Sequence, residues 1–206
     1  MVSRNPQASG EIPQKGTSPN KGYEATGRTR EHLTPNEMDK LLEAVKKFGR
    51  ESCRHRNHTI VLMMYRHGLR VAEAASLRWS DVSLEDGSIY VRRLKGSKDS
   101  THPLQGDEIR ALRRLQRESK PSPYLFVDSK GTPLKETAIA TMIKRTGDGL
   151  LGFPIHSHMM RHSCGHYLAS KGIDTRTIQD YLGHSNIMHT VRYTQLSANK
   201  FRNLWG

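Results

Sequence analysis

The densest group of side chains able to do chemistry lies in the run IHSHMMRHSCGH, between Ile155 and His166. A helix that begins near Ser157 places His158 and Arg161 on one face of its first turn, because residues three apart are neighbours on a helix. Free backbone N–H groups and the helix dipole attract anions to that end. Arginine grips two phosphate oxygens through its planar fork, and histidine exchanges protons near neutral pH. The run therefore predicts a phosphate site.

Three other positions are compatible with the same chemistry. Arg70, in HGLRVAEAASL, follows a helix stop and opens the next helix, with Glu73 one turn along to orient its guanidinium. His184 follows a second helix stop at Gly183 and can project into a cleft. Tyr193 comes nine residues later, and its hydroxyl is a weak nucleophile until cations or a base help to remove the proton. Taken singly, such an arginine is more often a surface residue and such a tyrosine a packing residue.

A metal site is the competing interpretation of the histidines. Two groups suggest it: His158, His162 and His166 at four-residue spacing, and Cys53, His55 and His58. Neither group contains a C-x-x-C pair or an obvious set of four ligands, as closed zinc sites usually do. We therefore expect no metal and no cofactor, and we interpret His162 and His166 as ordinary surface or core residues of a helix.

Length and charge limit the class of protein. The chain has 206 residues, with 33 Lys+Arg against 20 Asp+Glu and a formal net charge of +13. Residues 1–30 hold five basic and two acidic side chains, so most of the excess belongs to residues 31–206. A basic folded region favours a polyanionic partner such as nucleic acid, although a basic face kept for solubility is the simpler alternative.

Other classes are excluded by composition. No apolar run approaches the roughly 18 residues that a membrane span needs, and the N-terminus has no apolar core typical of a secretory signal. Two cysteines are too few for a disulfide framework and fit a reduced, cytosolic setting. The pattern also excludes a coiled coil.

The elements that must position these residues can be predicted from periodicity and caps. Residues 1–30 are rich in Gly, Pro, Ser and Asn and are predicted to be a disordered leader. Thr34, Pro35 and Glu37 form a capping box that opens the first helix, which ends at Gly49. The further predicted helices and strands are listed by range: helices at about 54–67, 70–77, 107–118, 135–146, 158–171, 174–182 and 186–194, strands at 88–94 and 100–104, and a strand or packed extended segment at 124–127. This order predicts a single, mostly α domain over residues 31–206 with a small antiparallel β-sheet (α+β).

Together the motifs resemble the tyrosine recombinases, or phage integrase family. The order of Arg in HGLRVAEAASL, Lys in a β-turn, H-x-x-R, L-G-H and then Tyr is specific to it, and the resemblance covers about residues 31–206. The stretches RLKGSKDSTHPL, HSHMMRHSCG and GIDTRTIQDYLGHSNIMHTVRYT most resemble the small fimbrial phase-switch invertases. The resemblance implies a site-specific recombinase that cuts and rejoins double-stranded DNA through a 3′-phosphotyrosine, for inversion or integration, on the nucleoid of a bacterial cell.

The same resemblance implies a role for each matching residue. Arg70 and Arg161 match the arginines that hold the non-bridging phosphate oxygens, with Glu73 supporting. His158 matches the histidine that assists proton transfer, and His184 matches the residue that hydrogen-bonds the phosphate. Tyr193 matches the nucleophile.

The β-turn is expected to supply further cations. Lys95 matches the lysine that protonates the leaving 5′ oxygen, and Lys98 is a second candidate because such loops shift register easily. We expect Arg92, Arg93 and Lys98 to contact DNA.

The resemblance also raises expectations about assembly. Larger members of the family have an N-terminal core-binding domain that completes a clamp around DNA, and only about 30 residues precede the first helix here, so we expect none. Four protomers on two DNA sites are the family's arrangement, with accessory DNA-bending proteins possible and residues 199–205 able to dock on a neighbouring protomer. The alternatives are a topoisomerase-like relaxing activity, a catalytically weak DNA-binding regulator of the same fold, and a zinc-dependent binding module.

Overall fold

The computed structural model describes residues 30–94 and 96–195. The predicted leader up to residue 29, the turn residue Lys95 and the C-terminal residues 196–206 lie outside that part of the chain. The last of these contain residues 199–205, which we expected to dock on a neighbouring protomer. The described elements, in chain order, are α1 (Pro35–Val45), α2 (Glu51–Arg66), α3 (Val71–Ser76), the 3-10 turn η2 (Trp79–Asp81), β1 (Val82–Ser83), β2 (Ser88–Val91), β3 (Ser100–Pro103), α4 (Gly106–Glu118), α5 (Glu136–Gly147), α6 (His158–Ser170), α7 (Thr175–Leu182) and α8 (Met188–Gln195).

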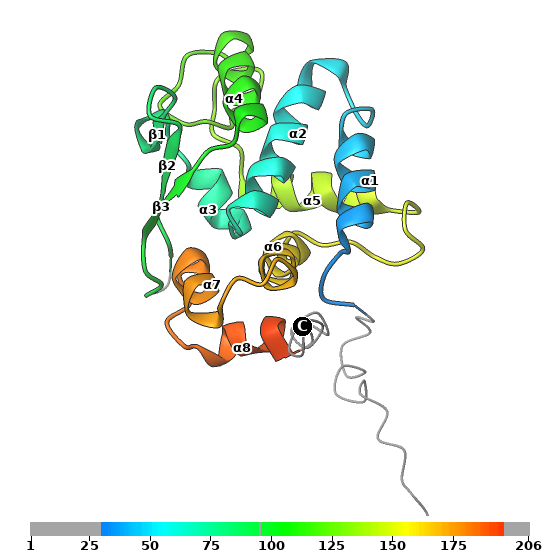
Figure 1. The fold of residues 1–206 in the computed structure, drawn as a ribbon. Helices are drawn as coiled ribbons and strands as arrows, with labels where there is room; N and C mark the ends of the chain where they lie inside the picture. The colour runs from blue at the N-terminus through cyan, green and yellow to red at the C-terminus, as the bar shows by residue number, and fades with distance from the viewer. Residues whose placement is uncertain (1–29, 95, 196–206) are drawn as a thin grey trace, which may run out of the picture.

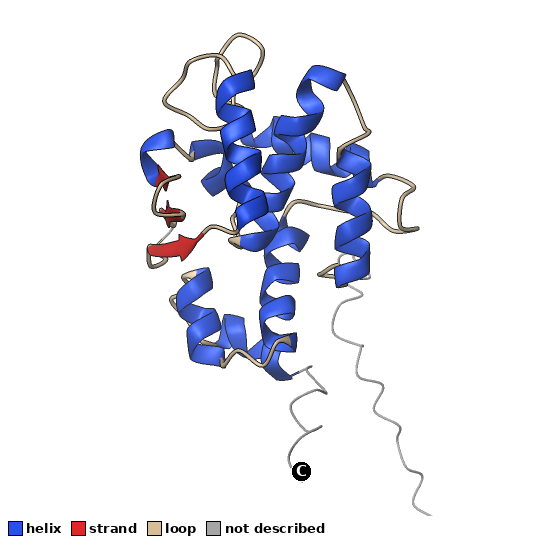
Figure 2. Ribbon diagram, turned by 45° about the horizontal axis from the view of Figure 1, so that its top comes forward, coloured by secondary structure: helices blue, strands red, loops and turns tan. Residues whose placement is uncertain are grey.

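Helix α2 is the centre of the architecture. It packs against α1, α3, α4, α5 and α6, and its apolar residues Ile60, Val61, Met63 and Met64 are buried in the main core. In Figure 1, α1 to α5 form one part of the molecule with the sheet at its edge, and α6, α7 and α8 form the other. Figure 2 shows how small the strand content is beside the helices. The predicted mostly α fold with a minor antiparallel sheet is confirmed.

The sheet is a three-stranded meander of order β1-β2-β3, antiparallel throughout. Strands β2 and β3 pair from Ser88 opposite Pro103 to Val91 opposite Ser100, so the chain between them turns back at residues 92–99. That turn extends from the edge of the sheet toward α7, because the Lys98 N–H donates to the Gly183 carbonyl at 3.3 Å. The basic turn between β2 and β3 therefore lies against the end of α7.

A small second core holds α6, α7 and α8 together. Its buried members are Cys164, Ala169, Ile178, Leu182 and Tyr193. The candidate nucleophile is therefore a core residue in this structure, and its surroundings are fixed by packing as well as by polar contacts.

Most local predictions hold, although several element ends differ: α1 ends at Val45 and β2 at Val91, both earlier than predicted. Thr34 and Asp174 are N-caps as predicted, and Gly183 ends α7 in the left-handed region at φ 69°. Ser157 precedes α6, but its side chain makes no capping bond, because its backbone is already helical. Residues 124–127 form the packed extended segment, the second of the two predicted alternatives, with Leu125 and Phe126 buried and isolated bridges at Tyr124 and Val127. The two-residue strand β1 was not predicted.

Within residues 30–94 and 96–195, none of the helices combines the length and the apolar character needed to cross a membrane.

Candidate active site

Arg161 lies at the junction of three helices. It projects from the first turn of α6, is only 1% exposed, and donates to the Gly68 carbonyl at 2.7 Å and the Leu182 carbonyl at 2.6 Å. These carbonyls lie where α2 and α7 end, and helix C-termini favour cations. Burial first, and then the charges of neighbouring arginines, lower its pKa to about 10, so the guanidinium keeps its charge at neutral pH. Arg161 is a positive charge that is fixed in place before any ligand arrives.

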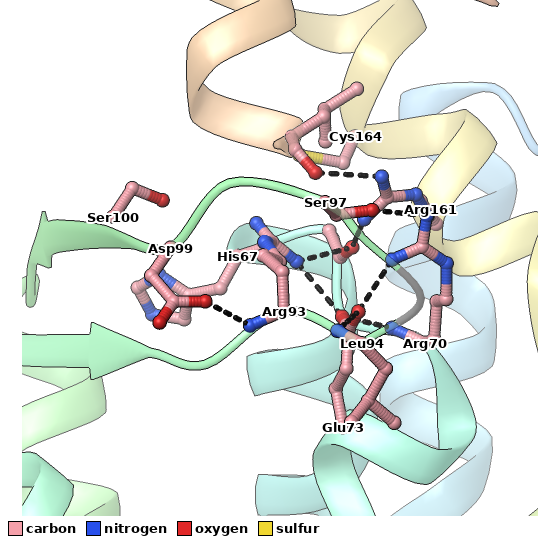
Figure 3. Close-up of polar contacts among 12 residues, drawn as sticks. His67, Arg70, Glu73, Arg93, Leu94, Ser97, Asp99, Ser100, Arg161 and Cys164 are labelled. Carbon is pink, nitrogen blue, oxygen red and sulfur yellow. Dashed lines mark hydrogen bonds and ion pairs between the residues drawn. The ribbon is translucent and has the colours of Figure 1, made fainter. Parts of the chain in front are cut away.

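Arg70 is held by Glu73 at the start of α3. The Glu73 carboxylate accepts from the Arg70 backbone N–H at 2.9 Å and from its Nη1 at 2.6 Å. Burial alone would raise the pKa of Glu73, but these bonds and the nearby arginine charges bring it below its ordinary value. The Arg70 Nη2 also donates to the Ser97 hydroxyl at 3.2 Å. The predicted support of Arg70 by Glu73 is therefore present, and it extends into the β2–β3 turn (Figure 3).

Arg93 corrects one sequence expectation. We expected it to contact DNA, but its side chain has 0% exposure. Its guanidinium pairs with Glu73 at 3.0 Å (Figure 3). It also donates to the carbonyls of His67 and Tyr181 at 2.9 and 2.7 Å. A guanidinium with these buried partners cannot reach solvent without leaving them. Arg93 therefore anchors the start of the turn against the body of the domain.

The other cations of the turn differ in position. Arg92 is exposed and pairs with Asp81 at 2.6 Å, so contact with DNA remains a prediction for it. Lys98 is exposed and is absent from the pocket described below, although its backbone is tied to α7. Lys95 lies outside the described residues. Its neighbours are fixed, because the Leu94 N–H donates to Glu73 at 3.4 Å and Ser97 accepts from Arg70.

Two histidines predicted for the site face one pocket in neutral form. Burial, followed by the charge of Arg161, lowers the pKa of His158 to about 4 and that of His184 to about 3. His184 comes directly after the left-handed Gly183, and its Nδ1 lies 2.8 Å from the hydroxyl of the buried Thr190. Both rings are therefore uncharged at neutral pH and can donate one hydrogen bond and accept another.

Tyr193 is almost completely buried. It is 2% exposed, and its hydroxyl lies 3.0 Å from the Nδ1 of His162. Burial raises the pKa of the phenol to about 12, while the charges of Arg161 and Arg192 act in the opposite direction. The ring packs directly on Gly165, where an added Cβ would lie 2.6 Å from it. A glycine in the middle of α6 is therefore what lets the tyrosine approach.

One pocket of about 220 Å³ brings the candidates together. Its lining includes five of the six predicted catalytic residues, Arg70, His158, Arg161, His184 and Tyr193. They come from four separate segments of the chain, at the start of α3, on α6, after α7 and on α8. Among the described residues, its lining carries three arginines and four histidines and no carboxylate. Its size and charge suit one phosphate group with a nucleophile at its side.

Sequence reasoning missed some of the lining. Ser97, His162, Ser185, His189 and Arg192 also face the pocket. His162, which we interpreted as an ordinary surface or core residue of a helix, is a buried residue of α6 whose Nδ1 lies 3.0 Å from the Tyr193 hydroxyl. Its position one turn after His158 on the same helix face was the signal that could have identified it.

No metal centre is formed by the histidines in the described segments. Among residues 30–94 and 96–195, no group of three or more His, Cys, Asp or Glu side chains is arranged to hold an ion.

Comparison with known proteins gives a consistent match. The model of the phage integrase family matches residues 31–200. The type 1 fimbriae regulatory protein FimB of Escherichia coli (strain K12) is 41% identical over 187 residues, which are 88% of this chain and 92% of FimB. The tyrosine recombinase XerA of Pyrococcus furiosus is 34% identical over 174 residues, covering 82% of this chain and 59% of XerA.

One solved structure is similar to this chain in both fold and sequence. The crystal structure of the XerH site-specific recombinase bound to its difH substrate, in a pre-cleavage complex, superimposes with a TM-score of 0.70 at 27% identity. The match covers 83% of this chain and 52% of the XerH chain.

Proposed function

The chain belongs to the phage integrase family and is a site-specific DNA recombinase, and we propose that its arginine-lined pocket holds the scissile phosphate for attack by Tyr193. The observation that carries this assignment is the convergence of Arg70, His158, Arg161, His184 and Tyr193 on one pocket of about 220 Å³. DNA is the partner, as it is in the solved recombinase complex that the fold resembles.

The pocket's charge suits the reaction. Attack on a phosphodiester builds negative charge on the equatorial oxygens, and preorganised cations stabilise it. Arg161 is already fixed by two helix-end carbonyls and Arg70 by Glu73, so neither needs to reorganise when DNA binds. Neutral His158 and His184 can donate hydrogen bonds to the same oxygens without adding charge.

The chemical steps conserve bond energy. The Tyr193 oxygen forms a bond to phosphorus, the bond to the 5′ oxygen breaks, and the 5′ oxygen takes a proton from Lys95, our candidate general acid. The protein is then joined to the 3′ phosphate of the cut strand. A 5′ hydroxyl from a second strand reverses the sequence and releases Tyr193. Because the phosphodiester energy is kept in the phosphotyrosine, the reaction needs no nucleotide hydrolysis.

A nicked suicide substrate tests the assignment. Such a DNA loses the short 5′ fragment after cleavage, so covalent protein accumulates and can be counted on a denaturing gel. Tyr193→Phe should form no adduct while keeping DNA affinity within about threefold of wild type, since only one hydroxyl is removed. A DNA-binding regulator without turnover is the second candidate, and a wild-type protein that binds the same DNA and never forms an adduct would favour it.

We further propose that the recombination reaction inverts a DNA segment. The resemblance of this chain's motifs to the fimbrial phase-switch invertases favours inversion over integration, and the chain is 41% and 38% identical to the type 1 fimbriae regulatory proteins FimB and FimE over most of their length. Trapped adducts from cells, sequenced at the attached DNA, would identify the two sites. Sites in inverted orientation on one chromosome would support inversion, whereas one site on mobile DNA and one on the chromosome would support integration.

The assembly we propose is four protomers on two DNA sites, helped by DNA-bending proteins. A single pocket with a single tyrosine cuts one strand, and recombination of two duplexes requires four cuts. Mass measurement of the synaptic complex with Tyr193→Phe protein tests it, and a complex of two protomers would contradict it.

A further inference from the structure

The Tyr193 hydroxyl meets a histidine that the family resemblance did not single out. Among the residues that the structure describes, the Nδ1 of His162 is its hydrogen-bond partner, at 3.0 Å. His158, which matches the family's proton-transfer histidine, lies one turn earlier on α6 and meets the His162 ring edge-on, with centroids 4.6 Å apart. The basic nitrogen in contact with the reacting oxygen is therefore that of His162.

The surroundings of His162 keep its imidazole neutral. It is 8% exposed, and burial is the largest cause that lowers its pKa, to about 2. The charged and titratable groups that face it are His158, Arg161 and His166 from its own helix and Arg192 from α8, and all act in the same direction. A neutral imidazole has one bare ring nitrogen, and the phenolic hydroxyl is a donor that can point at it.

Binding of DNA is expected to make protonation of His162 easier. A phosphodiester in the pocket places a negative charge near Arg161 and Arg192, both of which line it. An opposite charge within a few ångströms favours the protonated form of a base. The cost of forming an imidazolium at His162 is therefore highest in the empty pocket and falls when the substrate is in place.

We propose that His162 is a catalytic base, which takes the proton of Tyr193 during cleavage and returns it during ligation. The proposal rests on Tyr193 being the nucleophile. As the O–H bond of Tyr193 breaks, its electron pair forms the new bond to phosphorus and its proton forms an N–H bond at Nδ1 of His162. The bond from phosphorus to the 5′ oxygen breaks, and that oxygen leaves with the proton of the general acid. Ligation runs each step in reverse.

The simpler alternative is that His162 only positions the hydroxyl. The two roles are separated by His162→Asn, because an asparagine amide oxygen near the Nδ1 position can accept a hydrogen bond but cannot keep the proton. A positioning role predicts that asparagine restores the rate, whereas a base predicts that it does not. His166→Asn is the matched control, since His166 meets the Tyr193 ring edge to face, with ring centroids 5.0 Å apart, whereas His162 meets the hydroxyl.

The experiment is single-turnover cleavage of the nicked suicide substrate by the full chain, with DNA affinity and melting temperature measured for each variant. We expect His162→Asn to slow adduct formation by about 100-fold or more, the usual effect of losing a general base, while DNA affinity stays within about threefold. His166→Asn should remain within about threefold of wild type in both. If His162→Asn does not fold, His162→Gln is judged by the same criterion.

A second measurement changes the nucleophile. Incorporating 3-fluorotyrosine at position 193 makes the phenol more acidic, so it should restore part of the rate that His162→Asn loses. Adduct formation by His162→Asn within about threefold of wild type, or no gain from fluorotyrosine, overturns the proposal. The Tyr193→Phe protein keeps the two ideas apart, because an adduct that it still formed would remove the nucleophile assignment itself.

Discussion

Replacing Gly165 by alanine is expected to slow DNA cleavage even though helix propensity predicts a benefit. Alanine is about 1 kcal/mol more favourable than glycine in the interior of a helix, and Gly165 lies in the middle of α6. The structure predicts the opposite outcome, because the added Cβ would lie 2.6 Å from Cδ2 and Cε2 of Tyr193 and 2.8 Å from its Cζ. Ordinary contacts begin at 3.4 Å, so the rigid ring has to retreat by about 0.8 Å.

The displacement of the Tyr193 ring sets the expected loss of stability and of cleavage rate. Overpacking a buried site costs about 1–3 kcal/mol, which exceeds the gain in propensity. A misplacement of about 1 Å in a reacting group can cost about 100-fold in rate. We therefore expect Gly165→Ala to lower the melting temperature modestly and to slow adduct formation on the suicide substrate by about 100-fold, with DNA affinity little changed.

The matched control is Gly106→Ala, at the start of α4. There the added Cβ would meet only the end of the Arg110 side chain, at 3.4 Å. Its cleavage rate should equal that of wild type, and its melting temperature should be equal or higher. Wild-type cleavage by Gly165→Ala would refute the reasoning, since it would mean that the close approach of Tyr193 to α6 has no part in placing the nucleophile.

Three other outcomes follow from buried and partly buried charges. Glu73→Gln should lower the free energy of unfolding by about 3–5 kcal/mol in urea titrations, because it leaves Arg93 buried without its ionic partner; a loss below 1 kcal/mol would contradict this. Glu31→Gln removes a negative charge 3.6 Å from Arg192, so DNA should bind a few-fold more tightly at low salt, and unchanged affinity would count against it. Burial first, then nearby arginines and histidines, lower the pKa values of the pocket histidines from 6.5 to between about 2 and about 4. Between about pH 4 and 6.5 the unfolded state therefore binds more protons, so stability is full above pH 6.5 and falls on acidification by about 1.4 kcal/mol per pH unit for each such histidine; stability that rises from pH 7 to pH 5 would contradict the sign.

Much of the site could be predicted because local signals and motif order act together. Helix stops at Gly68 and Gly183 place Arg70 and His184 at helix ends, and H-x-x-R spacing places His158 and Arg161 on one face of α6. Those features depend on residues near in sequence, where periodicity and capping are informative. The pocket that the structure contains is lined by the same side chains.

The features of the site that the sequence did not predict depend on contacts between segments that are distant in the chain. Arg92 and Arg93 are neighbours in a basic turn, and nothing local distinguishes the exposed one from the one that is buried on Glu73 and three carbonyls. His162 reaches Tyr193 only because α8 packs across α6 at Gly165. Such packing is a property of the assembled core, and a single sequence does not contain its geometry.

The most direct measurement is mass spectrometry of the trapped protein–DNA adduct. Proteolysis of the complex formed by wild-type protein on the suicide substrate should give one modified peptide, with the nucleotide joined to Tyr193 through its 3′ phosphate. The other end of the cut strand should carry a free 5′ hydroxyl that polynucleotide kinase labels without prior phosphatase treatment. Attachment to any other residue, or a 5′ phosphate at the cut, would contradict the assignment of Tyr193 as the nucleophile of this recombinase.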